Sequence, residues 1–318
     1  MYESSSLRRE DGRPVIGLAL GSGAARGWAH IGVLQALKRE GIEVDVVCGC
    51  SIGALVGAAH ASGRTDALAD WVSGLTRADV LGLLDISLRS GLIRGERVLQ
   101  YCGTHFFAED FESLDVPFAC VATELATGQE LWLHTGRLAA AVRASIALPG
   151  LFAPVARKGR VLVDGGLVNP VPVSLCRAMG AEVVIAVELG SRPASWVARP
   201  APAQGTDTRL EAGLARRIFG SMRLPIPSPG SAAVDDLPLP SLAEVVTSSV
   251  NLMQMRIARS RLAGEPADVL VSPQVAHLNT MDFHRADEAM DEGRAAVQRA
   301  RPVLAQALGA SVERNDEP

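Results

Sequence analysis

The sequence predicts an α/β protein built as one large domain. Strand-like and helix-like segments alternate through the first part of the chain without a clear break. The 318 residues are 48% hydrophobic, which is enough to bury a sizeable core. A strand running directly into a helix at residues 44–59 marks the centre of this arrangement. We therefore expect a single domain over 14–310, between polar tails at 1–13 and 311–318, with an insertion at 191–240.

The first unit is a strand followed by a glycine-rich turn and a helix. Residues 15–20 form a short apolar run, and residues 28–40 have a helical pattern that ends at a glycine. In the turn from Gly21 to Gly27, the main-chain N–H groups can approach a ligand closely because three residues lack a side chain. Arg26 replaces the last glycine of a dinucleotide-binding fingerprint, and the second strand does not end in an acid, so we do not expect a dinucleotide site.

The second unit places Ser51 at the corner between a strand and a helix. Three valines in residues 44–47 indicate the strand, and the Ala- and Leu-rich segment after Gly53 indicates the helix. The corner is Gly49-Cys50-Ser51-Ile52-Gly53, which has the G-x-S-x-G spacing of a nucleophile elbow. Glycines flank the serine there because the strained turn leaves no room for Cβ atoms. Alone, this short pattern also fits a tight turn in which the serine caps the helix.

The alternation of elements continues beyond residue 115, after a loosely helical region at 66–115 to which we assign no chemistry. One later strand ends on Asp164 and is followed by Gly165 and Gly166, so this carboxylate can point into a crevice at the end of the sheet. The expected strands are 116–123, 129–134, 160–164, 182–189 and 268–272. The expected helices are 137–145, 242–263, 282–308 and one that follows Pro172 and ends at Met179.

A nucleophilic serine needs a base to take its proton and donors for the oxyanion. No histidine follows a late strand, as the Ser, Asp, His order of the α/β-hydrolases requires, and His30 and His60 fall inside predicted helices. Asp164 is therefore the better candidate for the base. The turn at 21–27 and the amide of Ile52 are the candidates for the oxyanion donors.

Four motifs follow one another in the chain: Gly21-x-Gly23-x-x-Arg26-Gly27, Gly49-x-Ser51-x-Gly53, the block from Ala144 to Pro154, and Asp164-Gly165-Gly166. With these motifs the chain resembles the patatin-like phospholipase family, strongly over residues 14–190. Segments 242–263 and 282–294 resemble the bacterial RssA-like branch, which is close to the esterase domain of neuropathy target esterase.

The resemblance implies a three-layer α/β/α fold with a mixed, mostly parallel sheet. It also implies a serine hydrolase that cleaves lipid acyl esters without calcium, through a Ser51–Asp164 dyad and an acyl-enzyme. We expect no metal and no cofactor. The implied oxyanion hole is Gly21, Gly23, Ala24, Arg26, Gly27 and Ile52, and the residues implied to shape the elbow and loops are Gly49, Gly53, Gly165 and Gly166.

Further roles are expected for Arg26, Ser145 and Pro149 in these motifs and for Asn169 after the last of them. Arg26 either orients a phosphate or caps and pairs on the surface. Ser145 and Pro149 are expected to shape the site, and Asn169 to fix the loop after Asp164.

Composition restricts the partners and the compartment. The formal net charge of −4 gives no reason to expect nucleic acid as a partner. Five irregularly spaced cysteines favour reduced thiols, and residues 1–14 contain no apolar secretory segment, so we expect a cytoplasmic protein. Lys38 and Lys158 are the only lysines in the sequence, which indicates a GC-rich bacterial coding bias.

The insertion at 191–240 is rich in Pro, Ala, Ser and Gly, which is typical of a long or partly disordered loop. Within it, residues 210–224 form a short basic amphipathic stretch that either packs on its own domain or lies on the inner, anionic face of a membrane. Two other functions stay open: a regulatory or scaffolding protein with an unknown protein partner, and a soluble esterase or thioesterase.

Overall fold

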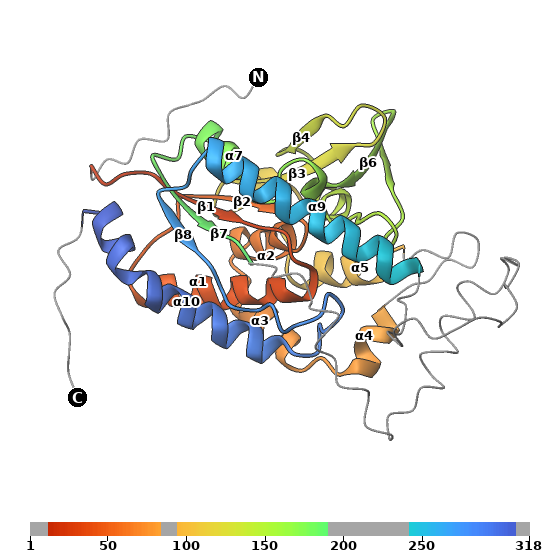
Figure 1. Ribbon diagram of the computed structural model, residues 1–318, viewed down its shortest axis with the longest axis horizontal. Coiled ribbons are helices and arrows are strands. Elements are labelled where there is room, and N and C mark those ends of the chain that lie inside the picture. Colours follow the sequence, from red (N-terminus) through yellow and green to blue (C-terminus); the bar gives the residue numbers. More distant parts are fainter. Residues whose placement is uncertain (1–11, 84–93, 190–241, 310–318) are drawn as a thin grey trace, which may run out of the picture.

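The computed structural model describes residues 12–83, 94–189 and 242–309, and an eight-stranded mixed sheet lies at its centre (Figure 1). The strand order is β5-β6-β3-β2-β1-β7-β8, and β4 pairs with β3. Strands β3, β2, β1, β7 and β8 are parallel, whereas β4, β5 and β6 form antiparallel pairs. The strands are β1 (Ile16–Leu20), β2 (Val46–Cys50), β3 (Phe118–Glu124), β4 (Glu130–Leu133), β5 (Val155–Arg157), β6 (Arg160–Asp164), β7 (Val183–Val187) and β8 (Val269–Val271).

Helices cover both faces of the sheet, which makes a three-layer α/β/α fold. Figure 1 shows α1, α3 and α10 below the sheet and α7 and α9 above it. The described helices are α1 (Ala29–Arg39), α2 (Ile52–Ala61), α3 (Thr65–Ser73), α4 (Arg77–Leu83), α5 (Glu96–His105), α6 (Leu138–Ser145), α7 (Val173–Ala178), α9 (Leu242–Gly264) and α10 (Ala286–Ala307), with 3-10 turns η1 (Ala24–Trp28), η2 (Phe111–Ser113) and η3 (Gly165–Leu167).

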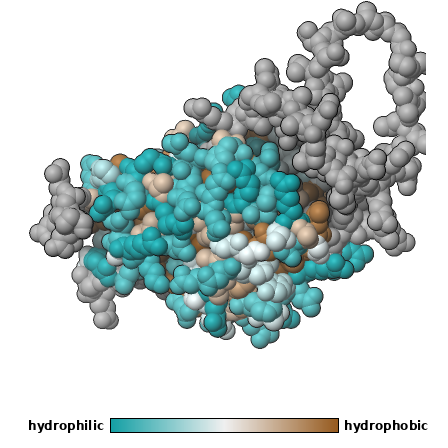
Figure 2. All heavy atoms as spheres, turned by 90° about the horizontal axis from the view of Figure 1, so that it is seen from below, coloured by the Kyte–Doolittle hydropathy of each residue, from teal (hydrophilic) through white to brown (hydrophobic). Residues whose placement is uncertain are grey.

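The central strands are apolar on both sides because both sides are covered. Along β1, Leu18 and Leu20 contribute to the larger core under α1, α2 and α10, whereas Ala19 contributes to the smaller core under α7. Such continuous apolar runs are typical of parallel strands between two helical layers. The outer surface on the α10 side is mostly hydrophilic (Figure 2).

The predicted elements are present, with ends that move by a few residues. The strand expected at 116–123 is Phe118–Glu124, and the helix expected from 282 begins at Ala286. The short strand β5 was not predicted, because its three residues are too few to show a periodicity. The insertion at 191–240, with the basic stretch at 210–224, lies outside the described residues, as do residues 1–11 and the whole tail at 311–318. No helix in the described ranges combines the length and apolar character needed to cross a bilayer.

Candidate active site

Ser51 lies at the sharp corner between β2 and α2, in a strained backbone conformation. Its φ of 56° and ψ of −123° are unusual for a residue with a side chain. A Cβ atom on Gly53 would lie 2.2 Å from the main-chain oxygen of Leu20, and one on Gly49 would lie 2.5 Å from the Cα of Ala54. The corner therefore requires glycine on both sides of the serine.

The hydroxyl of Ser51 donates a hydrogen bond to Asp164 and does not cap helix α2. Ser51 Oγ donates to Asp164 Oδ2 over 2.6 Å, and α2 has no side-chain hydrogen bond at its N-cap. The main-chain amide of Ser51 donates to Ser145 Oγ over 3.0 Å, which fixes the corner against the end of α6. This geometry does not support the simple capping interpretation of the G-x-S-x-G pattern.

Asp164 ends β6 and is completely buried, with 0% of its surface exposed. Its second carboxylate oxygen, Oδ1, accepts from the amide of Gly166 over 2.7 Å, and Gln254 Nε2 approaches the same oxygen at 3.5 Å. Its carbonyl oxygen accepts from Thr123 Oγ1 over 2.8 Å. Contacts from β3, the η3 turn and α9 thus hold the carboxylate in one orientation toward Ser51.

Burial raises the pKa of Asp164 to about 6, although the hydrogen bonds from Ser51 and Gly166 act in the opposite direction. Desolvation dominates because the charged carboxylate has lost its water. A carboxylate with a pKa near 6 is a stronger base than an ordinary aspartate while it stays ionised at neutral pH.

The glycine-rich turn passes beside Ser51, and some of its main-chain amides donate hydrogen bonds to other parts of the chain. The amide of Gly21 donates to the carbonyl of Val187 over 3.0 Å, so this residue joins the turn to β7. The main-chain bonds outside helices and strands do not use the amides of Gly23, Ala24 or Ile52. All three of these residues line cavities that Ser51 also lines. Of the six residues expected for the oxyanion hole, these three and Arg26 line a cavity together with Ser51.

Gly27 and His30 support the turn from behind. A Cβ atom on Gly27 would lie 2.2 Å from the side chain of Ile52, so the turn and α2 pack closely because of this glycine. His30 is completely buried, and burial lowers its pKa to about 4, so its ring is neutral. Its Nε2 donates to the carbonyl of Gly21 over 2.8 Å. His30 therefore belongs to the support of the turn.

Arg26 points inward and not onto the surface. It is 4% exposed, and its Nη2 donates to Asn251 Oδ1 of α9 over 3.2 Å. Asn169 is also buried and donates to Glu130 Oε1 over 2.8 Å, behind the loop that follows Asp164. Gly165 and Gly166 form the η3 turn in that loop.

Neither Ser51 nor Asp164 is hydrogen-bonded to a histidine. Within the described ranges, His, Cys, Asp and Glu side chains nowhere gather in a group of three that could hold a metal ion. The structure brings together a serine and a carboxylate beside a glycine-rich turn.

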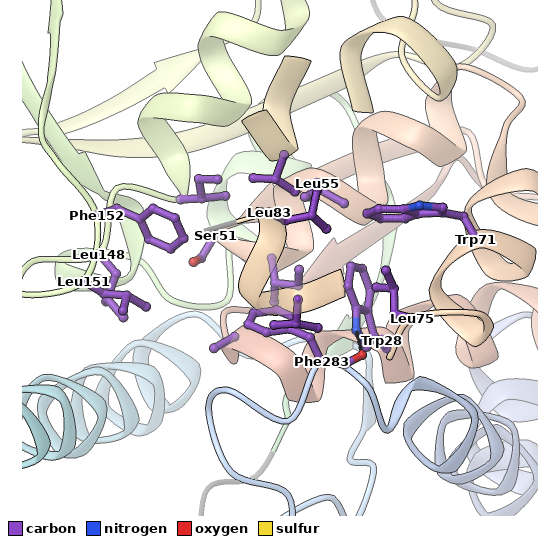
Figure 3. A pocket seen from close by; sticks show the side chains of 15 residues that line it. Trp28, Ser51, Leu55, Trp71, Leu75, Leu83, Leu148, Leu151, Phe152 and Phe283 are labelled. Carbon is purple, nitrogen blue, oxygen red and sulfur yellow. Dashed lines mark hydrogen bonds between the residues drawn. The ribbon is translucent and has the colours of Figure 1, made fainter. Parts of the chain in front are cut away.

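An apolar cavity of about 100 Å³ opens beside Ser51. Figure 3 shows Ser51 near Phe152 at one side of the cavity and the indole of Trp71 at the other. Apart from Ser51 its lining is hydrophobic: Ala24, Trp28, Ile52, Leu55, Trp71, Leu75, Val80, Leu83, Val98, Ile146, Leu148, Leu151, Phe152 and Phe283.

Two contributions to the site were not predicted from the sequence. Gln254 of α9 is buried; it accepts from Ser22 Oγ over 3.3 Å and lies 3.5 Å from Asp164, so it links the turn to the carboxylate. The cavity wall that contains Trp71 comes from α3, α4 and α5, a region to which we assigned no chemistry. No short motif marks either contribution.

Comparison with known proteins shows the family to which the chain belongs. The family model of the patatin-like phospholipases matches residues 18–177. An uncharacterized NTE family protein of Mycobacterium tuberculosis is 34% identical over 94% of this chain and 95% of its own length. Patatin-like phospholipase domain-containing protein 7 of Mus musculus is 36% identical over 56% of this chain, which is 14% of its own length. The crystal structure of VipD from Legionella pneumophila is 12% identical and covers 99% of this chain and 86% of its own, with a TM-score of 0.36.

The family match indicates a lipid-ester hydrolase. The chain belongs to the patatin-like phospholipase family.

Proposed function

We propose that the protein is a serine acyl hydrolase of the phospholipase or lysophospholipase type. The observation that carries this proposal is the 2.6 Å hydrogen bond from Ser51 Oγ to the buried carboxylate of Asp164, at the edge of an apolar cavity. A serine held against a carboxylate in a strained elbow is arranged for nucleophilic attack.

Each step of the proposed reaction uses a group in the site. Asp164 accepts the proton of Ser51 as Oγ attacks the acyl carbonyl carbon, and the amides of Gly23, Ala24 and Ile52 stabilise the oxyanion. Collapse of the tetrahedral intermediate expels the alcohol, which takes the proton from Asp164. Asp164 then deprotonates a water molecule, which attacks the acyl-enzyme. The fatty acid is released as Asp164 returns the proton to Ser51 Oγ, which restores both groups.

The cavity beside Ser51 supports a fatty acyl chain as the acyl group. Its lining is hydrophobic apart from the serine itself (Figure 3), so a hydrocarbon chain loses no hydrogen bonds on entering it. A small polar acyl group would gain little binding free energy from this hydrophobic lining.

The test is the release of fatty acid from phospholipid and lysophospholipid vesicles, measured by mass spectrometry. We expect release by wild type and none by Ser51→Ala. Because main-chain amides stabilise the oxyanion in this mechanism, we expect release to continue with a calcium chelator present. Equal release by wild type and Ser51→Ala would refute the proposal.

A further inference from the structure

Asp164 is a buried carboxylate without a cationic partner. It is completely buried, and among the residues that the structure describes no Arg, Lys or His side chain forms an ion pair with it. Burying a charge is costly unless hydrogen-bond donors replace the water that it loses. The donors that face this carboxylate therefore decide how readily it stays ionised.

Three donors face the carboxylate, and each comes from a different element. Ser51 Oγ donates to Oδ2 over 2.6 Å, and the amide of Gly166 in η3 donates to Oδ1 over 2.7 Å. The third is Nε2 of Gln254 in α9, which lies 3.5 Å from Oδ1. The thiol of Cys50 on β2 stays neutral, because burial and then the charge of Asp164 raise its pKa well above the ordinary value. Apart from the nucleophile, Gln254 is thus the described side chain that donates toward the carboxylate.

The amide of Gln254 is held in the orientation that donates to Asp164. Its oxygen accepts from Ser22 Oγ over 3.3 Å, which leaves the NH2 group on the side of the carboxylate. Gln254 is 8% exposed, and a Cβ atom on Gly166 would lie 2.5 Å from Nε2, so the amide lies directly against the turn after Asp164. The main-chain amide of Ser22 donates to the carbonyl of Pro170 over 2.9 Å. One buried amide therefore joins the glycine-rich turn to the carboxylate.

A neutral donor suits a carboxylate that acts as a base. An adjacent arginine typically lowers the pKa of a carboxyl group by about 1–3 units, which would weaken it as a base. An amide orients the carboxylate with a smaller effect on its pKa. At 3.5 Å the contact from Gln254 is long, so its effect should also be smaller than that of the Gly166 amide at 2.7 Å.

We propose that Gln254 is a positioning residue, which holds Oδ2 of Asp164 toward Ser51 and favours the ionised carboxylate. This inference rests on the proposed hydrolase function and adds to it a residue that acts through the base. Because Gln254 does not line the apolar cavity beside Ser51, its replacement should change kcat much more than KM.

The experiment uses two variants and measures kcat and KM for a short-chain ester between pH 5 and 9. Gln254→Met keeps a side chain of similar length without the donor. We expect its kcat at high pH to fall by roughly tenfold and the acid limb of its pH profile to move up by roughly 0.5 unit. Gln254→Glu keeps an acceptor for Ser22 but places a second carboxylate beside the first, so its limb should move up by about one unit or more.

Met255→Ala is the matched control, because Met255 is the next residue of α9 and is equally buried, at 7% exposed. It should lower Tm and leave the acid limb where wild type has it. The inference requires both the lower kcat and the shifted limb in Gln254→Met, and either effect without the other would overturn it. If Gln254→Met does not fold, the limb of Gln254→Glu decides. If neither folds, Ser22→Ala decides, with a smaller upward shift expected because it only frees the amide of Gln254.

A measurement without substrate separates this inference from the hydrolase proposal. The carboxyl carbon of Asp164, labelled with 13C and assigned by its absence from Asp164→Asn, is titrated by NMR in wild type and in Gln254→Met. We expect the higher pKa in the variant. A higher pKa in a protein that hydrolyses no ester would refute the hydrolase and support the contact between Gln254 and the carboxylate. Hydrolysis by wild type with equal pKa values in the two proteins would overturn the inference and leave the hydrolase standing.

Discussion

At the scale of single residues, Asp164 is completely buried and accepts a hydrogen bond from the hydroxyl of Ser51. The buried charge is unfavourable for folding, because its pKa of about 6 lies above the usual value of 3.8. The same burial makes the carboxylate a better base at neutral pH. We therefore interpret the cost of burial as part of the mechanism.

Replacing Asp164 by Asn tests this interpretation. Loss of the base should lower kcat by about 10²–10⁴-fold, because an amide cannot accept the serine proton. Above pH 7 the free energy of unfolding of the variant should exceed that of wild type by about 1–3 kcal/mol, because the buried charge is gone. Urea unfolding and fatty acid release measure the two effects. Activity near that of wild type would exclude Asp164 as the base.

The pH dependence of wild type follows from the same group. The ionised form of Asp164 is the active one, so kcat/KM should fall as pH is lowered through about 6. The sign for stability is the reverse: the folded state binds this proton more tightly than the unfolded state, so this group favours folding increasingly as pH falls from about 6 toward 3.8. The measurement is kcat/KM for a short-chain ester as a function of pH. If kcat/KM were unchanged down to pH 5, Asp164 would not be the base.

Sequence reasoning identified Ser51 and Asp164 because each ends a strand in a recognisable glycine pattern. It could not assign the inward direction of Arg26, since burial depends on α9, which follows in the chain more than two hundred residues later. Gln254 was missed for the same reason. A lone glutamine in a long helix has no local signal that relates it to a distant carboxylate.

At the scale of elements, the elbow depends on close contact between β2, α2 and β1. Gly53→Ala would place a Cβ 2.2 Å from the main-chain oxygen of Leu20, which cannot move away easily. We expect lower Tm and loss of esterase activity. Gly82→Ala is the matched control, because a Cβ on this exposed helical glycine meets nothing within 4 Å, and alanine there should be neutral or slightly stabilising. Equal behaviour of the two variants would argue against a strained elbow.

The far wall of the apolar cavity is an aromatic cluster. Trp71 of α3 stacks on Tyr101 of α5 with ring centroids 5.0 Å apart and contacts Phe106 at 5.5 Å. Because Trp71 faces Ser51 across the cavity (Figure 3), its indole limits the space for an acyl chain. The α/β order of elements was predictable, but this wall was not, since it is assembled from three helices with irregular apolar patterns.

Trp71→Leu should shift the preference toward longer acyl chains. We expect the kcat/KM ratio of the longest to the shortest chain in a homologous ester series to rise by roughly tenfold or more. Trp132→Leu, on the exposed surface of β4, is the control. If Trp71→Leu left the chain-length profile unchanged, the cavity would not be the acyl site.

At the scale of the whole molecule, the parallel sheet gathers the site from distant parts of the chain. The carboxyl ends of β1 and β2 bring the glycine turn and Ser51 together, and the antiparallel pairing of β6 with β3 adds Asp164. Alternating strand and helix patterns predicted this sheet. At the antiparallel edge, β4 corresponds to the strand expected at 129–134, whereas β5 could not be derived from local patterns because it has only three residues.

Contact with a membrane surface is a proposal at this scale, and it concerns the basic stretch at 210–224. If the protein works at the inner face of a membrane, it should bind anionic vesicles better than neutral ones, and added salt should weaken this binding. Flotation with vesicles of both kinds measures it, for the full chain and for a chain lacking 205–235. Equal binding to both vesicle types, or no loss on deletion, would refute the proposal.

The most direct test of the central claim is the intact mass of the protein after exposure to a long-chain alkyl fluorophosphonate. Such a reagent reacts with an activated serine and leaves a stable adduct. We predict a single adduct on wild type, none on Ser51→Ala, and none or a strongly slowed one on Asp164→Asn. A folded wild-type protein that takes up no reagent, or an adduct that persists in Ser51→Ala, would contradict the assignment of Ser51 as the nucleophile.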